Sequence, residues 1–88
     1  MRNFFVFIKC ELGRTYDVAA ELVDSLDEAP RVHSVSGEFD LLAQFTLEDD
    51  VDIGRYVNQR VQVIDGIKDT QTLICFNAFT RDKGLGDG

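Results

Sequence analysis

The chain has 88 residues, 44% of them hydrophobic, and a formal net charge of −7 at pH 7. This length fits a single domain, and the acidic charge argues against a nucleic-acid surface, which requires a basic patch. No apolar run approaches the ~18 residues of a membrane helix, and the N-terminal segment lacks the pattern of a secretory signal. We therefore expect a cytoplasmic protein that does not bind duplex DNA by itself.

Strand and helix patterns alternate in the first third of the chain. Asn3–Leu12 is predicted to be a strand with apolar residues on both faces. Tyr16–Leu26 has helical spacing, with Thr15 as a plausible N-cap. Its apolar stripe consists of Val18, Ala19, Leu22, Val23 and Leu26. Pro30 follows the helix, and Arg31–Ser36 is predicted to be a short edge strand.

A hairpin pattern occupies the middle of the chain, at His33–Leu47. Gly37 suits a turn, and apolar residues recur at period two in Leu41–Leu47, as in a strand. Asp40 lies at this turn, before the apolar strand. One interpretation makes Asp40 an ordinary turn residue that bonds backbone N–H groups, and the other makes it a functional carboxylate.

The second half of the chain repeats the helix–strand order. Val51–Ile64 is predicted to be a helix that Asp49 or Asp50 caps. Ile67–Phe79 is predicted to be a long strand with apolar residues on both faces. The polar, glycine-rich tail Thr80–Gly88 has no periodicity, and we expect it to be disordered.

The resulting order, β-α-β-β-α-β, predicts an α+β fold of the ferredoxin-like type. It consists of a four-stranded antiparallel sheet with two helices on one face, and strands one and three lie at its centre. The folded domain would span residues 1–79, followed by a flexible tail at 80–88. Because two helices cover only one face, the apolar residues of the other face predict a homo-oligomer. Two sheets packed face to face would form a dimeric α+β barrel.

The residues that carry enzyme chemistry are sparse. Cys10 and Cys75 lie in apolar runs without a CxxC motif, so we interpret both as reduced core residues and expect no metal site. The single histidine, His33, lies on the predicted edge strand, and no nucleophile elbow or phosphate loop is present. We therefore predict no enzyme activity, no catalytic residue and no cofactor. The alternative is an enzyme of the dimeric α+β barrel type, such as a monooxygenase or isomerase, which the fold alone does not exclude.

Two motifs occur at matching positions in this order of elements. The first motif, at 32–41, is V-x-x-x-x-G-x-[FY]-D followed by a hydrophobic residue. The second, at 66–72, is a glycine and a hydrophobic residue followed, after two residues, by Thr-x-Thr. With these motifs, the span Asn3–Phe79 resembles the effector-binding domain of the Lrp/AsnC (feast/famine) transcriptional regulators. Family members usually carry an N-terminal helix-turn-helix domain, so the chain resembles a stand-alone form of the effector domain.

The resemblance implies a module that senses a small molecule, typically an amino acid, and takes part in transcription regulation. Dimers of the family assemble into rings, and effectors bind at the contacts between dimers. The implied ligand-binding residues are Ser36, Gly37, Glu38, Phe39, Asp40, Thr70 and Thr72. Asp40 would accept the ammonium group, while hydroxyl groups and backbone amides near Gly37 would hold the carboxylate. The implied partners are further copies of the chain, as a dimer or a ring of dimers, and full-length regulators of the family.

Two other functions of the same oligomer remain open at this point. The chain could be a ligand-free oligomerisation partner of full-length regulators. It could also be an ACT domain, whose ligand site uses the loop after strand one, here Leu12-Gly13-Arg14.

Overall fold

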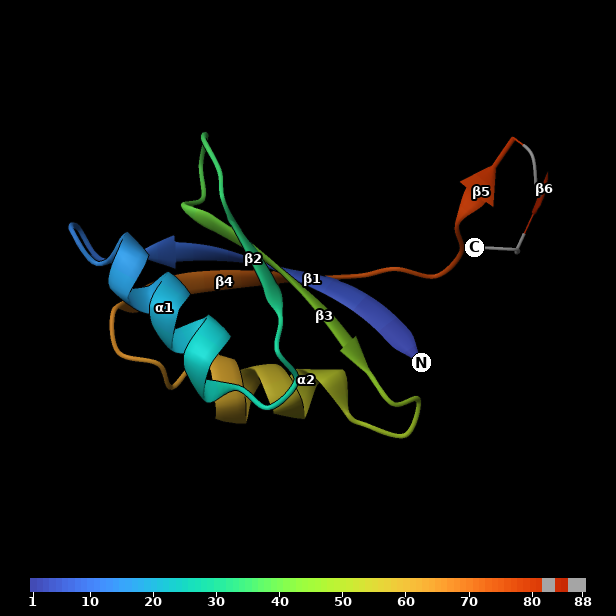
Figure 1. Ribbon diagram of the computed structural model, residues 1–88, viewed down its shortest axis with the longest axis horizontal. Helices are drawn as coiled ribbons and strands as arrows, with labels where there is room; N and C mark the ends of the chain where they lie inside the picture. The colour runs from blue at the N-terminus through green and yellow to red at the C-terminus, as the bar shows by residue number, and fades with distance from the viewer. Residues whose placement is uncertain (82–83, 86–88) are drawn as a thin grey trace.

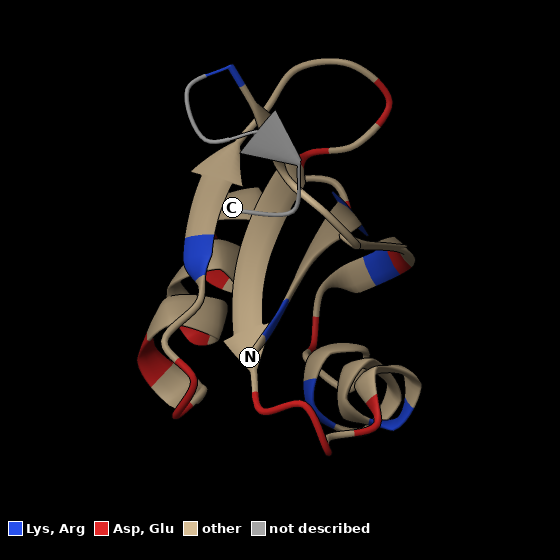
Figure 2. Cartoon of the chain, turned by 90° about the vertical axis from the view of Figure 1, so that its right-hand side faces the viewer, with Lys and Arg blue, Asp and Glu red and all other residues tan. Residues whose placement is uncertain are grey.

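The computed structural model describes residues 1–81 and 84–85. Four strands form an antiparallel sheet in the order β2-β3-β1-β4: β1 (Arg2–Cys10), β2 (Arg31–Ser34), β3 (Leu41–Leu47) and β4 (Ile67–Ile74). Helix α1 (Thr15–Ser25) and helix α2 (Ile53–Tyr56), which continues as the π-helical turn η1 (Val57–Val61), lie on one face (Figures 1 and 2). The predicted ferredoxin-like α+β fold, with strands one and three at the centre, is confirmed.

Alternation along β1 divides its side chains between the two faces of the sheet. Phe4, Val6 and Ile8 are completely buried beneath the helices. Phe5 and Phe7 therefore point to the opposite side, since successive residues of a strand face opposite ways. We call this side the open face. The strand register assigns to it Asn3, Phe5, Phe7, Lys9, Arg31, His33, Leu42, Gln44, Thr46, Asp69, Gln71 and Leu73.

An aromatic cluster joins the sheet to the second helix. The rings of Phe4 and Phe45 stack at 5.1 Å, and the edge of Tyr56 meets both. The Tyr56 hydroxyl donates a hydrogen bond of 2.7 Å to Oε1 of Glu28, in the loop after α1. This bond lowers the pKa of the Glu28 carboxyl, while burial and the nearby Glu28 raise the pKa of Tyr56. The bond thus fixes the loop between α1 and β2 to α2.

We predict that Tyr56→Phe lowers the free energy of unfolding by about 1–2 kcal/mol at pH 7, because a hydrogen bond to a charged group is lost. The pKa of Glu28 is lower in the folded state, so its contribution is present above about pH 4.5 and disappears as the pH falls through the lowered value. Urea denaturation at several pH values should therefore show a difference from wild type that shrinks in acid. Tyr16→Phe is the control, since Tyr16 is 80% exposed. A constant difference at all pH values would contradict the role of Glu28.

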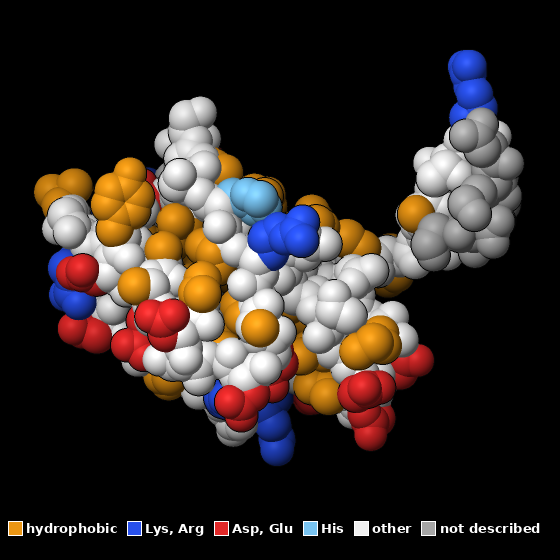
Figure 3. Space-filling model, in the orientation of Figure 1, with side chains coloured by type: hydrophobic (Ala, Val, Ile, Leu, Met, Phe, Trp, Pro, Cys, Tyr) orange, Lys and Arg blue, Asp and Glu red, His pale blue; other side chains and the backbone are white. Residues whose placement is uncertain are grey.

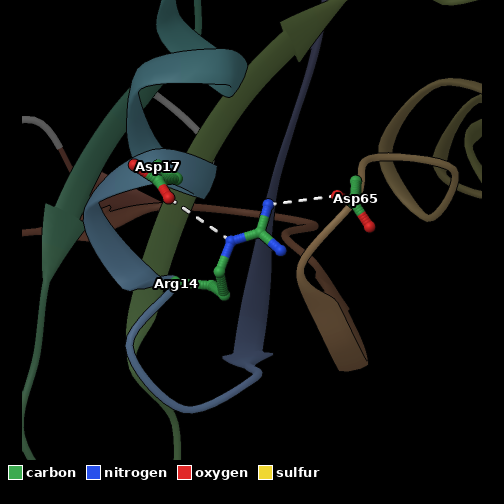
Figure 4. Close-up of polar contacts among 3 residues, drawn as sticks. All are labelled: Arg14, Asp17 and Asp65. Carbon is green, nitrogen blue, oxygen red and sulfur yellow. Dashed lines mark hydrogen bonds and ion pairs between the residues drawn. The ribbon is translucent and has the colours of Figure 1, made fainter.

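Arg14 connects the start of α1 to the turn before β4. Its guanidinium donates to Asp17 at 3.3 Å and to Asp65 at 3.1 Å, as Figure 4 shows. The chain then turns at Gly66, which has a φ of +100° and is buried. A Cβ atom at Gly66 would lie 2.9 Å from Cγ2 of Val18 and 3.3 Å from Cβ of Arg14. Glycine is therefore required here both for the backbone conformation and for the close approach of α1.

We predict that Gly66→Ala destabilises the fold by about 2–4 kcal/mol, the sum of backbone strain and overpacking against α1. Gly37→Ala is the matched control, because Gly37 also has a positive φ, +107°, but has no atom within 4 Å of an added Cβ. It should cost only the strain, about 1–2 kcal/mol. Equal losses of stability in thermal melts of the two variants would contradict the steric argument.

Several predicted helix details are wrong. Thr15 lies inside α1, whose N-cap is Arg14 without a side-chain cap bond. The second helix begins after Asp52, which accepts a hydrogen bond from the Arg55 amide at 3.1 Å, so neither Asp49 nor Asp50 is the cap. Val23 belongs to the apolar stripe predicted for the first helix but is 50% exposed, because the sheet covers only the Val18 and Leu22 side of α1.

The last predicted strand ends earlier than expected, at Ile74 instead of Phe79. Cys75 is consequently exposed and is not a core residue, whereas Cys10 is buried as predicted. Beyond it, β5 (Phe79–Thr80) pairs with β6 (Gly84–Leu85) in a separate two-stranded sheet. The expected disordered tail at 80–88 therefore contains paired backbone at Thr80, while positions 82–83 and 86–88 lie outside the described residues.

Candidate functional site

The loop between β2 and β3 is closed by backbone hydrogen bonds around Asp40. The amide of Val35 donates to the carbonyl of Asp40 at 3.0 Å, and the amide of Asp40 donates to the carbonyl of Ile8 at 2.9 Å. Gly37 supplies the positive φ that the loop needs. These contacts hold Asp40 at the junction of β1, β2 and β3, near the end of β1 that leads into α1.

The Asp40 carboxylate continues the hydrogen-bond pattern of the sheet just before the start of β3. Its Oδ2 atom accepts a hydrogen bond of 2.8 Å from the amide of Cys10. The prediction that Asp40 bonds a backbone N–H is confirmed, although the donor belongs to β1 and not to the turn itself. A carboxylate that accepts one backbone amide still has lone pairs on both oxygens for another donor.

The Cys10 thiol beside this carboxylate is a packing group. Burial raises its pKa, the negative charge of Asp40 raises it further, and a hydrogen bond with Thr15 opposes both effects. A thiol with a raised pKa is protonated at neutral pH and is a poor nucleophile. Cys10 therefore gives the site no catalytic chemistry.

Asp40 forms part of the walls of two neighbouring hollows. One, of about 570 Å³, lies against the start of α1, and its other wall residues are Thr15, Tyr16, Ser34, Val35 and Ser36. The second, of about 360 Å³, lies between the loop after β1 and the hairpin loop, and its walls include Lys9, Gly13, Gly37, Glu38 and Lys68. The Asp40 carboxylate thus borders both hollows, one with hydroxyl groups in its walls and the other with lysines.

The two lysines carry charges that no carboxylate neutralises at close range. The Lys9 ammonium donates to the backbone carbonyl of Glu38 at 3.2 Å. Across the described ranges 1–81 and 84–85, neither Lys9 nor Lys68 forms an ion pair. Asp69, which lies opposite Lys9 on β4, instead accepts from the amide of Thr70 at 2.9 Å. Although the chain as a whole is acidic, these two ammonium groups are available to bind an anionic group of a ligand.

Thr70 lies in a third hollow, on the helix side of the sheet. Its hydroxyl accepts a hydrogen bond of 2.7 Å from Nε2 of Gln62, the residue that follows η1. This hollow, of about 240 Å³, shares Lys68 with the hollow beside Asp40. Thr70 is therefore linked to the Asp40 region through Lys68 rather than by direct contact.

The remaining predicted residues lie apart from these hollows. The ring of Phe39 packs on Phe7 at 5.5 Å, at the border of the open face. Thr72 is exposed on the edge strand β4, opposite Val6. The structure thus brings together Ser36, Gly37, Glu38 and Asp40, and leaves Thr70 nearby and Thr72 separate.

Sequence reasoning missed three residues of this region: Lys9, Lys68 and Gln62. A lysine at the end of an otherwise apolar strand, as at Lys9, was the available signal. Another hollow, of about 530 Å³, lies at the opposite end of β1 against Phe5 and Ile74, and its walls include Arg2 but no carboxylate. We favour the Asp40 region as the ligand site because charged and hydrogen-bonding groups suited to a small molecule converge there.

The described part of the chain has no group of three or more His, Cys, Asp and Glu side chains that could hold a metal ion. His33 is exposed on β2, at the edge of the sheet. Among the helices of the described residues, none has the length and apolar character to cross a membrane.

Comparisons with known proteins agree with this geometry. Residues 3–85 match the sequence family described as the Lrp/AsnC ligand binding domain. The crystal structure of TTHA0845 from Thermus thermophilus has 31% identity and a TM-score of 0.78, and the match covers 92% of this chain and 100% of that one. No curated protein matches.

Two larger proteins share the fold at lower identity. The structure of Escherichia coli AsnC matches with 23% identity and a TM-score of 0.73, over 91% of this chain and 54% of that one. The transcriptional regulator NMB0573 of Neisseria meningitidis, solved as a complex with L-Met, matches with 18% identity and a TM-score of 0.75. That match covers 96% of this chain and 55% of the regulator, so this chain spans about half the length of each.

Proposed function

The chain belongs to the Lrp/AsnC ligand-binding domain family, and we propose that it is an oligomeric regulatory module that binds a free amino acid. One observation carries the proposal. The Asp40 carboxylate, fixed by the Cys10 amide, borders a hollow in which Lys9 and Lys68 have no carboxylate partner within the described ranges. A carboxylate beside ammonium groups that form no ion pair is complementary to a zwitterion.

We assign the contacts of the amino acid as follows. Asp40 accepts its ammonium group, and Lys9 and the backbone amides around Gly37 hold its carboxylate. Ser36 and Glu38 complete the wall of the hollows, and Thr70 contributes through the hollow that shares Lys68. Phe39 and Thr72 belong to the proposed site only if a second copy brings them to it. The complex of NMB0573 with L-Met, a protein of the same fold, supports an amino acid as the ligand.

The module is proposed to act as a homo-oligomer, a dimer or a ring of dimers, joined through the open face. Phe5, Phe7, Leu42 and Leu73 give this face an apolar surface that the helices leave uncovered. Contiguous apolar side chains that remain partly exposed on one face are typical of interaction sites. We place the module in the cytoplasm, like the regulators of the family. There we propose that it contributes to transcription regulation together with full-length regulators. We propose no catalytic step.

Titration calorimetry with each of the common amino acids tests the proposal. We expect one or a few of them to bind with a stoichiometry of at most one per chain, and the bound state to show a higher melting temperature. The matching 2-hydroxy acid has no α-ammonium group. If binding requires that group, the 2-hydroxy acid should bind more weakly than the amino acid. Absence of binding by every amino acid, with the oligomer intact, would instead favour the ligand-free partner of full-length regulators.

A further inference from the structure

The hollow against the start of α1 differs in charge from the hollow that contains the lysines. We call it the α1 hollow, and its walls are Thr15, Tyr16, Ser34, Val35, Ser36 and Asp40. Asp40 is the only charged residue among them. The hollow with the lysines also has the carboxylates of Glu11 and Glu38 in its walls. The volume of the α1 hollow, about 570 Å³, lies within the range of about 300–1,000 Å³ that is typical of ligand sites.

An aromatic ring in the α1 hollow is open to solvent. Tyr16 is 80% exposed, and it takes part in none of the ring contacts among the described residues. The other tyrosine, Tyr56, is 7% exposed and packs on two phenylalanines. Val35 adds a second exposed apolar side chain to the same hollow. Figure 3 shows hydrophobic side chains at the surface of this end of the molecule, between the start of α1 and the hairpin loop.

Hydrogen bonds hold both apolar side chains in place relative to Asp40. The amide of Val35 donates to the Asp40 carbonyl at 3.0 Å. On the other side of the hollow, Thr15 forms a hydrogen bond with the thiol of Cys10, whose amide donates to the Asp40 carboxylate at 2.8 Å. Tyr16 follows Thr15 in the first turn of α1. The ring, the valine and the carboxylate therefore belong to one hydrogen-bonded frame.

The covalent structure of an amino acid determines where its side chain would lie in this frame. The ammonium group, the carboxylate and the side chain leave the same Cα atom in different directions. In the proposed function the ammonium group lies on Asp40 and the carboxylate lies toward Lys9. The side chain then points away from the lysines, and the α1 hollow is the other hollow that Asp40 borders.

A charged ligand side chain would find no counter-ion in the α1 hollow. An acidic side chain would lie beside Asp40, with no cation in the walls. A basic side chain would compete with the ligand's own ammonium group for Asp40. Asp17, the next carboxylate on α1, does not border the hollow and already pairs with Arg14 at 3.3 Å. Because a charge removed from water without a partner is unfavourable, the hollow discriminates against charged side chains.

We propose that the chain selects an amino acid with a large, uncharged and mainly apolar side chain, which packs on Tyr16 and Val35 in the α1 hollow. Tyr16 is the residue that determines this specificity, and its ring rather than its hydroxyl group makes the contact. Leucine, methionine and phenylalanine belong to this class of ligand. The inference rests on the proposed function and adds to it the class of amino acid.

Calorimetry of the full chain with matched ligands tests the selection. L-Norleucine and L-lysine share a butyl side chain, to which lysine adds a terminal ammonium group, and L-glutamate is the acidic counterpart. We expect the dissociation constant of norleucine to be at least about tenfold lower than those of lysine and glutamate. Lysine or glutamate binding as tightly as norleucine would overturn the selection but leave amino-acid binding intact. Absence of binding by every common amino acid would overturn the proposed function as well.

Substitutions of Tyr16 test the role of the ring. Tyr16→Ser should raise the dissociation constant of norleucine at least about tenfold, and that of L-alanine less than about threefold, because alanine is too short to cover the ring. Tyr16→Phe keeps the ring and should retain the affinity for norleucine. Val63→Ser is the control, since Val63 is 69% exposed and lies in the walls of neither hollow.

Three results of these measurements would overturn the role of Tyr16. The first is an unchanged affinity of Tyr16→Ser for norleucine. The second is a loss of affinity that is as large for alanine as for norleucine, which indicates a structural effect on the site. The third is an equal loss in Tyr16→Phe, which assigns the contact to the hydroxyl group. Circular dichroism of each variant verifies that the chain is folded.

Discussion

Replacing Asp40 with asparagine is expected to lower the affinity for the amino acid by ~2–5 kcal/mol, roughly thirty-fold or more, while the chain stays folded. Asparagine keeps the shape of the side chain and an oxygen that can accept from the Cys10 amide at the observed 2.8 Å. It loses the negative charge that pairs with the ligand's ammonium group. Because Asp40 is half-buried, water replaces this charge pair less effectively than on an open surface.

Asp52→Asn is the matched control for this variant. Asp52 also uses a carboxylate oxygen to accept a backbone amide, that of Arg55, but it lies at the start of α2 and borders none of the hollows beside Asp40. Asparagine is as good an N-cap as aspartate, so both stability and affinity should be retained. Thermal melting and calorimetry are measured on both variants.

The interpretation of Asp40 as an ordinary turn residue gives the opposite result. In that case Asp40→Asn would lower the melting temperature, because a charge-assisted hydrogen bond to Cys10 becomes a neutral one. The affinity of the folded fraction would then remain unchanged. A loss of stability combined with unchanged affinity would remove Asp40 from the ligand site.

Period-two alternation allowed the fold to be predicted from the sequence. The apolar residues of Leu41–Leu47 and of β1 recur at the spacing of a strand, and the order of elements leaves few arrangements of the sheet. The exact caps were not predictable, since Asp49, Asp50 and Asp52 are all suitable cap residues. Only the packing of Ile53 into the core determines which aspartate lies at the helix start.

The end of the last strand was mispredicted for a physical reason. Apolar residues on both faces of Ile67–Phe79 predict a strand inside the sheet over the whole segment. The same pattern also describes a segment whose apolar residues are exposed in one copy of the chain, as Phe76 and Phe79 are. Sequence alternation reports that a residue can be buried, but it does not report whether the rest of the chain covers it.

The candidate site was predictable only in part. The motif around Gly37 located Asp40, because a turn at a fixed spacing leaves a local signal. Lys9 and Lys68 are brought together by the pairing of β1 with β4, and no local pattern connects residues so far apart in the chain. The same pairing places Thr72 opposite Val6, away from the hollows that Thr70 and Asp40 border.

The open face leads to the second large effect that we expect. Phe7→Ser should raise the dissociation constant of the dimer roughly 30- to 1000-fold. Full burial of one phenylalanine contributes about 1.5–3 kcal/mol, Phe7 is already half-buried by its neighbours, and two-fold symmetry removes the side chain from both copies. A total loss of about 2–4 kcal/mol per dimer corresponds to this range.

The same substitution should leave the fold of each subunit intact, since Phe7 points away from the helices and its only ring contact among the described residues is Phe39. Circular dichroism of the variant should therefore match that of wild type, while light scattering shows monomers at micromolar concentration. Val23→Ser is the control, because Val23 is 50% exposed on the outer side of α1 and should leave the dimer unchanged. If Phe7→Ser remains a dimer as tight as wild type, the open face is not the interface, and the copies must associate through another surface.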